Sequence, residues 1–136
     1  MKLILNKCYG GFGISPEGYA LYAKKKGLPL YAYYYNWNDK TMRKTSLDDR
    51  KNIVDYFTKD FGDIAPAEND KWDYALRLYG DKYRQDPVLI EVVEELGDKA
   101  NGRYAALKIV EVPDGLTYVV DDYDGIETLH EDVPTW

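Results

Sequence analysis

The chain has 136 residues, of which 45% are apolar and 31% charged, a balance typical of globular rather than disordered proteins. Its formal charge of −6 argues against binding along a nucleic-acid backbone, and its single cysteine excludes an internal disulfide. No apolar run approaches the roughly 18 residues of a membrane-spanning helix, and the N-terminus lacks the apolar core of a secretory signal. We therefore expect one domain over residues 1–136 in a reducing cytoplasm.

The chain opens with a predicted strand at Leu3–Leu5, which leads through a glycine-rich turn into a helix. Ser15 is expected to cap this helix, Pro16 suits its first position, and Gly27 ends it. The following stretch, Leu28–Trp37, is dense in aromatic residues and alternates strictly, so it predicts a strand.

The middle of the chain gives weaker signals. Residues 38–45 are polar and are predicted to form a loop. The Ser-x-x-Asp sequence at 46–49 resembles an acidic capping box, and the apolar spacing after it predicts a helix that ends at Gly62. Residues 63–71 are expected to be an exposed connection, whereas 72–79 fit a strand or a helix, with aromatic alternation favouring the strand.

The last third is punctuated more clearly. Asp86-Pro87 opens a predicted helix with apolar residues at a period of 3.6, and Gly97 closes it. Residues 105–112 alternate as a strand, and Asp124-Gly125 is a hairpin turn signal within residues 118–131. This order of elements predicts an α+β fold: a single two-layer domain with a mostly antiparallel or mixed sheet, two to three helices and a C-terminal β-hairpin.

The glycine-rich turn is the first candidate ligand site. The backbone N–H groups of a turn just before a helix can bind an anion, and Lys7 would add a positive charge. The spacing matches neither a Walker loop nor the GxGxxG fingerprint, so a purely structural turn stays the alternative. The candidate ligand-binding residues of this region are Asn6, Lys7, Tyr9, Gly10, Gly11, Phe12, Gly13 and Ser15.

An aromatic strand face is the second candidate site. Fourteen residues of the chain are tyrosines, and Tyr31, Tyr33, Tyr35 and Trp37 share one face of the predicted strand. Such a face can stack a planar ligand, for which Tyr33 and Tyr35 are the candidate residues. The alternatives are packing against a helix or a seam between copies in a homo-oligomer.

Catalytic signals are sparse. Cys8 and His130 would be the minimum for thiol catalysis, but 122 residues separate them and nothing in the sequence brings them together. The acidic residues are plentiful but show no pattern typical of general acid–base chemistry. We therefore expect no catalytic residue, no enzymatic activity and no cofactor.

The acidic hairpin partly matches a calcium loop at Asp122, Asp124, Gly125 and Glu131. The first ligand position holds a valine, however, and strands rather than helices flank the loop, so we expect no metal site. The hairpin register places Asp122 opposite Glu127, a repulsive pair. Simple exposure, a bound cation or a nearby Lys or Arg would each resolve that repulsion, and exposure is the commonest solution.

Several segments resemble a group of short phage and prophage proteins. These are the opening Asn6–Gly13 with its Ser-started helix, the segments 86–97 and 106–113, and the terminal Thr135-Trp136. The resemblance covers residues 1–30 and 84–136 and leaves the tyrosine-rich middle unmatched. It implies a phage protein that acts in the cytoplasm of the infected host.

In that setting, the first hypothesis is a small binding protein that sequesters a nucleotide-like signalling molecule and thereby counters host immunity. The alternative is a protein-binding inhibitor of a host defence enzyme, which would use the acidic surface and the aromatic face. A small nucleotide-acting enzyme is the weakest hypothesis, because no nucleophile–base pair is visible. The expected partners are thus a nucleotide-like small molecule or a host protein, not a membrane or a nucleic acid, with homo-oligomer formation as a further expectation.

Overall fold

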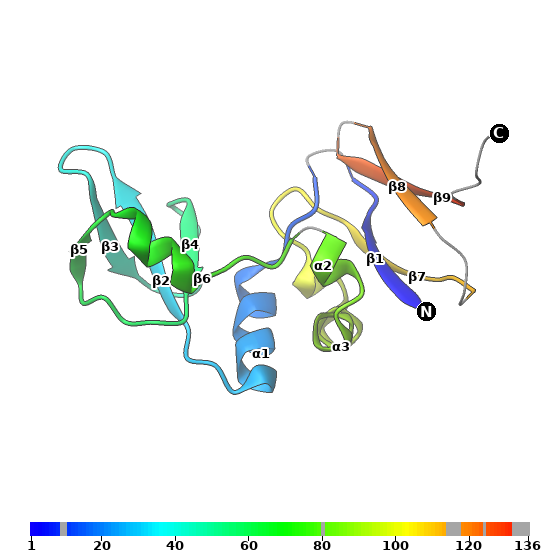
Figure 1. Cartoon of the computed structure of the whole chain (residues 1–136), viewed down its shortest axis with the longest axis horizontal. Coiled ribbons are helices and arrows are strands. Elements are labelled where there is room, and N and C mark those ends of the chain that lie inside the picture. The colour runs from blue at the N-terminus through cyan, green and yellow to red at the C-terminus, as the bar shows by residue number, and fades with distance from the viewer. Residues whose placement is uncertain (9–10, 80, 114–117, 124, 132–136) are drawn as a thin grey trace. The chain divides into compact units, whose positions relative to one another are not determined.

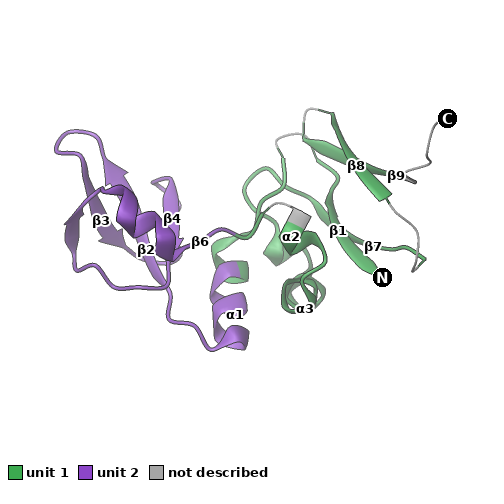
Figure 2. Cartoon of the chain, in the orientation of Figure 1, with its two compact units in different colours: residues 1–18, 78–136 green, residues 19–77 purple. Residues whose placement is uncertain are grey.

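The computed structural model describes residues 1–8, 11–79, 81–113, 118–123 and 125–131 (Figure 1). It has an α+β fold with antiparallel sheets and a C-terminal β-hairpin, as the sequence predicts. The chain divides into two compact units, shown in Figure 2. Unit 1 comprises residues 1–18 and 78–136, and unit 2 comprises residues 19–77. Unit 2 is therefore a continuous segment that interrupts unit 1 in the sequence.

Unit 1 contains two antiparallel strand pairs and the helices that follow unit 2 in the chain. The first pair is β1 with β7 and the second is the hairpin β8–β9. Helix α3 packs against both β1 and β7, and β9 lies beside β1. The elements are β1 (Lys2–Asn6), α2 (Asp81–Arg84), α3 (Pro87–Leu96), the 3-10 helix η2 (Gly97–Ala100), β7 (Leu107–Glu111), β8 (Tyr118–Tyr123) and β9 (Ile126–Glu131).

Helix α3 begins and ends where its sequence signals predict. The Asp86 carboxylate caps it by accepting hydrogen bonds from the amides of Val88 at 2.9 Å and Leu89 at 3.4 Å. Gly97 follows with a φ of +58°, a conformation that glycine adopts without strain. The apolar face of α3 and strand β1 supply much of the core of unit 1, namely Leu3, Ile4, Leu5, Leu89, Ile90, Val92 and Val93.

Helix α1 (Pro16–Lys26) also has the predicted bounds. The Ser15 hydroxyl accepts a hydrogen bond from the Gly18 amide at 3.1 Å and donates one to the Lys99 carbonyl at 2.5 Å. Gly27 ends the helix with a φ of +68°. Ser15 is thus an N-cap that also ties the start of α1 to η2.

Unit 2 is built around one five-stranded antiparallel sheet with the strand order β5-β3-β2-β4-β6. Strand β2 lies at its centre and realises the predicted aromatic strand. The elements are β2 (Tyr31–Asn36), β3 (Thr41–Thr45), β4 (Val54–Phe57), β5 (Ile64–Pro66), the 3-10 helix η1 (Asn69–Tyr74) and β6 (Ala75–Leu76).

The middle of the chain corrects several predictions. The loop predicted over 38–45 is wrong beyond its first residues, because 41–45 is strand β3. Residues 37–40 form the turn of a β2–β3 hairpin, and Lys40 takes a φ of +57° there. The Asp39 carboxylate holds the turn by accepting hydrogen bonds from the Thr41 amide at 3.2 Å and hydroxyl at 2.6 Å. The sequence pattern did not predict this polar strand, because its pairing with β2 stabilises it and its own composition does not favour a strand.

The helix predicted to end at Gly62 is also wrong. Residues 54–57 form β4 instead, which pairs with β2 from Tyr34↔Val54 to Tyr31↔Phe57. Four apolar residues at helical spacing were outweighed by this pairing with the central strand. The segment 63–71 contains the short edge strand β5 rather than only a connection, and the ambiguous 72–79 begins in η1 and continues as β6.

The two faces of the unit 2 sheet are covered differently. On one face Tyr33, Met42 and Phe57 form a core against which Phe61 and Trp72 pack. The rings of Tyr33 and Phe57 meet edge to face with their centroids 5.6 Å apart. On the other face Ala32, Tyr56 and Leu76 are buried, and the Tyr19 ring of α1 stacks on Tyr56 at 4.1 Å.

Candidate functional site

Asn6, the first residue of the predicted glycine-loop site, is fully buried and serves the fold. Its backbone amide donates to Glu127 Oε1 at 2.7 Å, and its side-chain amide donates to the carbonyls of Cys8 at 2.8 Å and Gly125 at 2.6 Å. Its side-chain oxygen accepts from the Ala106 amide at 2.8 Å. Every polar group of the side chain is used, so Asn6 positions the start of the loop rather than contacting a ligand.

A buried ion pair lies beside Asn6, and the sequence did not reveal it. The Glu127 carboxylate, 3% exposed, accepts hydrogen bonds from both terminal nitrogens of the Arg84 guanidinium, one of them at 2.7 Å. The same guanidinium donates to the Ile4 carbonyl at 3.1 Å, and its carbon lies 5.2 Å from the centre of the Phe12 ring. The pair therefore joins α2, β1 and β9, with the glycine-rich loop against it.

The hairpin register places Asp122 opposite Glu127, as predicted. The expectation that exposure resolves the repulsion is wrong for Glu127, since an arginine neutralises it in the interior. Asp122 is exposed and accepts a hydrogen bond from the Gly125 amide at 2.7 Å. Of the three alternatives, the basic partner is the one present.

The loop itself keeps unused backbone donors. Gly11 has a φ of +99°, a backbone conformation that residues other than glycine adopt only with strain. Among the described residues, no acceptor is found for the amide N–H groups of Gly11, Phe12 and Gly13, which precede helix α1. Lys7 is exposed, and its ammonium group donates to the Glu127 carbonyl at 2.8 Å.

Close backbone packing fixes the far end of the loop. The Gly102 amide donates to the Gly13 carbonyl at 2.9 Å, and a Cβ atom on Gly102 would lie only 2.7 Å from the Gly13 carbonyl carbon. This close approach requires glycine at position 102, whereas a Cβ atom on Gly13 would meet only the Gly102 Cα at 3.6 Å, an ordinary contact. Tyr9 and Gly10, which belong to the predicted site, lie outside the described residues.

The predicted stacking residues Tyr33 and Tyr35 belong to unit 2, whereas the glycine-rich loop belongs to unit 1. Tyr33 is 1% exposed; its hydroxyl donates to the Gly62 carbonyl at 2.8 Å and accepts from the Phe61 amide at 2.9 Å. Burial raises the pKa of this phenol above its ordinary value. Tyr33 is therefore a core residue with no free ring face, while Tyr35 is half-buried and meets the exposed Trp37 edge to face.

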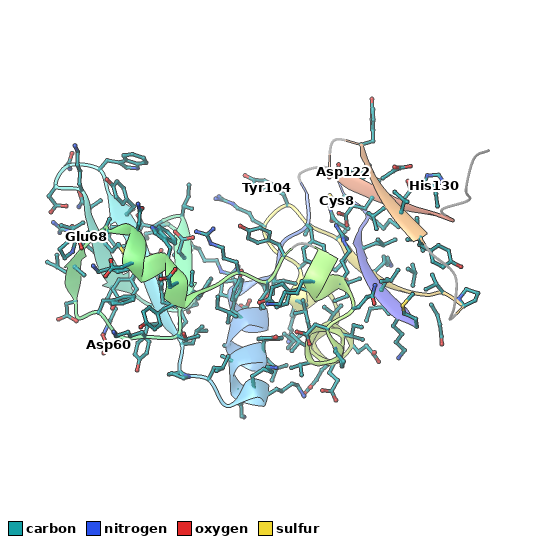
Figure 3. All side chains as sticks on the ribbon, viewed as in Figure 1. Cys8, Asp60, Glu68, Tyr104, Asp122 and His130 are labelled. Carbon is teal, nitrogen blue, oxygen red and sulfur yellow. The ribbon has the colours of Figure 1, made fainter. Side chains whose placement is uncertain are left out.

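The residues considered for catalysis and metal binding have other contacts. His130, on the hairpin in Figure 3, lies 2.9 Å from the Asp121 carboxylate and 3.3 Å from the Thr128 hydroxyl. Within the described residues, no hydrogen bond or ion pair joins it to Cys8, which is half-buried. Within the described part of the chain, no group of three or more His, Cys, Asp or Glu residues is placed to hold a metal ion. In the same part, every helix is too short or too polar to cross a bilayer.

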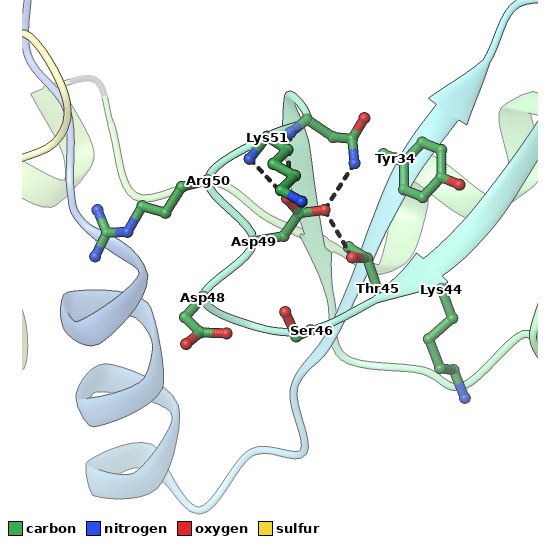
Figure 4. Close-up of a pocket in the computed structure, with 9 residues that line it drawn as sticks. Tyr34, Lys44, Thr45, Ser46, Asp48, Asp49, Arg50 and Lys51 are labelled. Atoms are coloured by element: carbon green, nitrogen blue, oxygen red, sulfur yellow. Dashed lines mark hydrogen bonds between the residues drawn. The ribbon is translucent and has the colours of Figure 1, made fainter.

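A surface depression in unit 2 is a second site that the sequence did not predict (Figure 4). It is open to solvent, with a volume of about 590 Å³, and is lined by Tyr34, Lys44, Thr45 and most of the loop 46–52. The residues that carry charge in this lining are Lys44, Asp48, Asp49, Arg50 and Lys51.

Asp49 organises the wall of this depression. Its carboxylate accepts hydrogen bonds from the Asn52 side chain at 2.9 Å, the Thr45 hydroxyl at 2.7 Å and the Lys51 amide at 2.8 Å. These donors hold the pKa of the Asp49 carboxyl well below its usual range. The Ser-x-x-Asp sequence at 46–49, which predicted a helix cap, thus lies in a loop, where the Asp49 carboxylate accepts hydrogen bonds from loop donors.

Comparison with known proteins adds no family assignment. No family model matches the chain, and no match was found among characterised proteins or solved structures.

Proposed function

We propose that this protein is a non-catalytic binding protein whose glycine-rich loop captures the phosphate of a nucleotide-like small molecule. The resemblance to short phage proteins supplies the setting, in which such capture would sequester a signalling molecule of the infected host and counter its immunity. The ligand is bound and retained without being converted. Its charge would be read by backbone amides rather than by a catalytic side chain.

The observation that carries the proposal is the run of three amides, Gly11 to Gly13, without acceptors among the described residues. They precede α1, an 11-residue helix, whose dipole favours negative charge at this end. Lys7 is exposed, and its ammonium group donates one hydrogen bond within the described part of the chain, so it retains donors for an anion. Asn6 and the buried Arg84–Glu127 pair support the loop from within.

The experiment is a thermal-shift screen of the full chain against nucleotides, cyclic nucleotides and ADP-ribose derivatives. A ligand at 100 times its dissociation constant should stabilise the protein by about 2.7 kcal/mol, which corresponds to several degrees. The shift should shrink in Lys7→Ala and Gly11→Ala. Lys108→Ala and Gly97→Ala are matched controls, because Lys108 is exposed in unit 1 and Gly97 also has a positive φ with no atom within 4 Å of an added Cβ.

A shift that all four variants share equally would contradict binding at the loop. Analysis of the recovered ligand then separates sequestration from turnover, since sequestration returns the ligand unchanged at one equivalent per site.

The second candidate function, inhibition of a host protein by direct binding, is favoured by one observation on unit 2. Ile53, Trp37 and Ile64 are 90%, 83% and 59% exposed, which is unusual for large apolar side chains. An inhibitor of this kind would show a flat ligand screen and would retain a host protein on an affinity column. Binding would weaken in Trp37→Ala but not in Lys7→Ala.

A further inference from the structure

A second loop of unit 1 runs beside the glycine-rich loop. Residues 102–106 lead into β7, and hydrogen bonds tie them to the glycine-rich loop at two points. The Gly102 amide donates to the Gly13 carbonyl at 2.9 Å, and the Lys7 amide donates to the Ala106 carbonyl at 2.8 Å. Figure 1 shows the two segments side by side, one in yellow before β7 and the other in blue after β1. The residues between Gly102 and Ala106 are therefore held next to the glycine-rich loop.

Arg103 and Tyr104 lie at the tip of this second loop. The Ala105 amide donates to the Gly102 carbonyl at 3.1 Å, which closes a four-residue turn with Arg103 and Tyr104 at its centre. Because consecutive Cα atoms are about 3.8 Å apart, the Tyr104 Cα lies at most about 7.6 Å from those of the anchored Gly102 and Ala106. Tyr104, labelled in Figure 3, is 65% exposed, and Arg103 is exposed as well. The turn thus presents an aromatic ring and a guanidinium to solvent.

The Arg103 guanidinium keeps its hydrogen-bond donors available. Its carbon lies over the Tyr104 ring, 5.7 Å from the ring centre, in a cation–π contact that uses none of its N–H groups. Within the described part of the chain, the Arg103 side chain forms no ion pair and no hydrogen bond. A phosphate beside the glycine-rich loop would therefore find a cation that is not already neutralised.

The Tyr104 ring keeps one face for a ligand. Arg103 lies over one face, and the exposure of the residue leaves the opposite face open to solvent. A nucleotide base stacks on such a face, whichever base it is, because every base has a π-face. Tyr104 belongs to the same unit as the glycine-rich loop, whereas Tyr33 and Tyr35, the stacking residues predicted from the sequence, belong to unit 2.

We propose that Tyr104 and Arg103 make the glycine-rich loop selective for nucleotides. Tyr104 stacks the aromatic base, while Arg103 joins Lys7 in neutralising the phosphate that the loop amides bind. This inference rests on the function proposed above and names the part of the ligand that backbone amides do not recognise. Nucleotides with different bases should therefore bind with similar affinity, and sugar phosphates without a base should bind more weakly.

The test is isothermal titration calorimetry of the full chain with adenosine 5′-monophosphate and with ribose 5-phosphate, which has the sugar and the phosphate but no base. The wild type should bind the nucleotide about 5–150-fold more tightly, the gain expected for one stacked base. Tyr104→Leu should abolish this preference and leave the affinity for ribose 5-phosphate unchanged, whereas Tyr104→Phe keeps the ring and should keep the preference. Arg103→Gln should weaken both ligands by the same factor, about tenfold or more, because it removes a charge-assisted hydrogen bond to the phosphate.

Tyr118→Leu is the matched control for the loss of a tyrosine. Tyr118 pairs with Glu131 at the end of the β8–β9 hairpin that lies away from its turn, whereas the turn carries the Gly125 carbonyl that accepts from Asn6. This variant should bind both ligands as the wild type does.

The outcomes separate this inference from the function on which it rests. Binding of both ligands with a nucleotide affinity that Tyr104→Leu does not change would overturn the stacking role and leave phosphate capture by the loop standing. An Arg103→Gln variant with wild-type affinities would overturn the role of the guanidinium. A wild type that binds neither ligand at millimolar concentration would overturn phosphate capture by the loop, and this inference with it.

Discussion

Glu127→Gln isolates the contribution of the buried ion pair to the stability of unit 1. The substitution nearly preserves side-chain volume but removes the negative charge that faces the Arg84 guanidinium. It also places an amide NH₂ where one carboxylate oxygen now accepts hydrogen bonds. The Arg84 side chain is 11% exposed, so its charge would be left largely without solvent or partner. Asn6 would in addition risk losing the acceptor of its backbone amide, now 2.7 Å away.

The expected loss is about 3–5 kcal/mol, the cost of removing one member of a buried, hydrogen-bonded ion pair. Domains of this size are stable by about 5–15 kcal/mol, so this single change removes roughly a fifth or more of the total. The corresponding fall in melting temperature is about 10–20 °C. Replacing both partners, in Arg84→Met with Glu127→Leu, should cost less than the sum of the single changes, because no lone charge then stays buried.

Urea unfolding followed by far-UV circular dichroism measures the loss, and hydrogen exchange at the amides of Leu3–Leu5 assigns it to unit 1. The control is Glu94→Gln, which breaks an exposed pair with Lys2 whose side chains are both 46% exposed. That change should cost no more than about 1 kcal/mol. A loss in Glu127→Gln as small as the loss in Glu94→Gln would refute the reasoning.

Three further substitutions test local devices of the fold. Gly102→Ala drives a Cβ to 2.7 Å from the Gly13 backbone, so urea unfolding should show a loss of about 1–3 kcal/mol; an unchanged midpoint would contradict this contact. Asp86→Ala removes the N-cap of α3 and should cost about 1 kcal/mol, whereas Asp86→Asn should retain most of it. The lowered pKa of Asp49 gives stability that is present above about pH 4 and is lost as the pH falls through the folded-state pKa. Urea midpoints of Asp49→Asn should lack this part of the acid dependence, and parallel curves for both proteins would argue against it.

Helices α1 and α3 were predictable because their signals are local. The side chains of Ser15 and Asp86 accept hydrogen bonds from backbone amides in the first turn of the helix that each one precedes. The neighbouring sequence alone therefore determines where these helices start. The strand β3 and the absence of a helix before Gly62 depend instead on pairing with β2. The spacing of apolar residues within a segment does not predict such pairing, since it carries no information about residues far along the chain.

The candidate sites divide in the same way. The glycine-rich turn before α1 was predicted, because glycine, Ser15 and Pro16 signal it locally. The burial of Tyr33 was not, since Tyr33 and Tyr35 have the same sequence pattern and only the packing of Phe57 and Phe61 distinguishes them. Arg84 and Glu127 are 43 residues apart and belong to segments with no shared periodicity, so only the folded chain brings them together.

The interruption of unit 1 by unit 2 has a consequence for the order of events during synthesis. Strand β1 is made first, yet its partner β7 begins at Leu107, about 100 residues later. At roughly 5–20 residues per second, Leu3, Ile4 and Leu5 emerge several seconds before their partner strand exists. Unit 2, whose strands all lie within residues 19–77, has every partner available by then. Unit 2 is thus able to fold first, and strands β1 and β7 of unit 1 pair later. In the interval, the apolar strand β1 is exposed to any cellular protein that binds such strands.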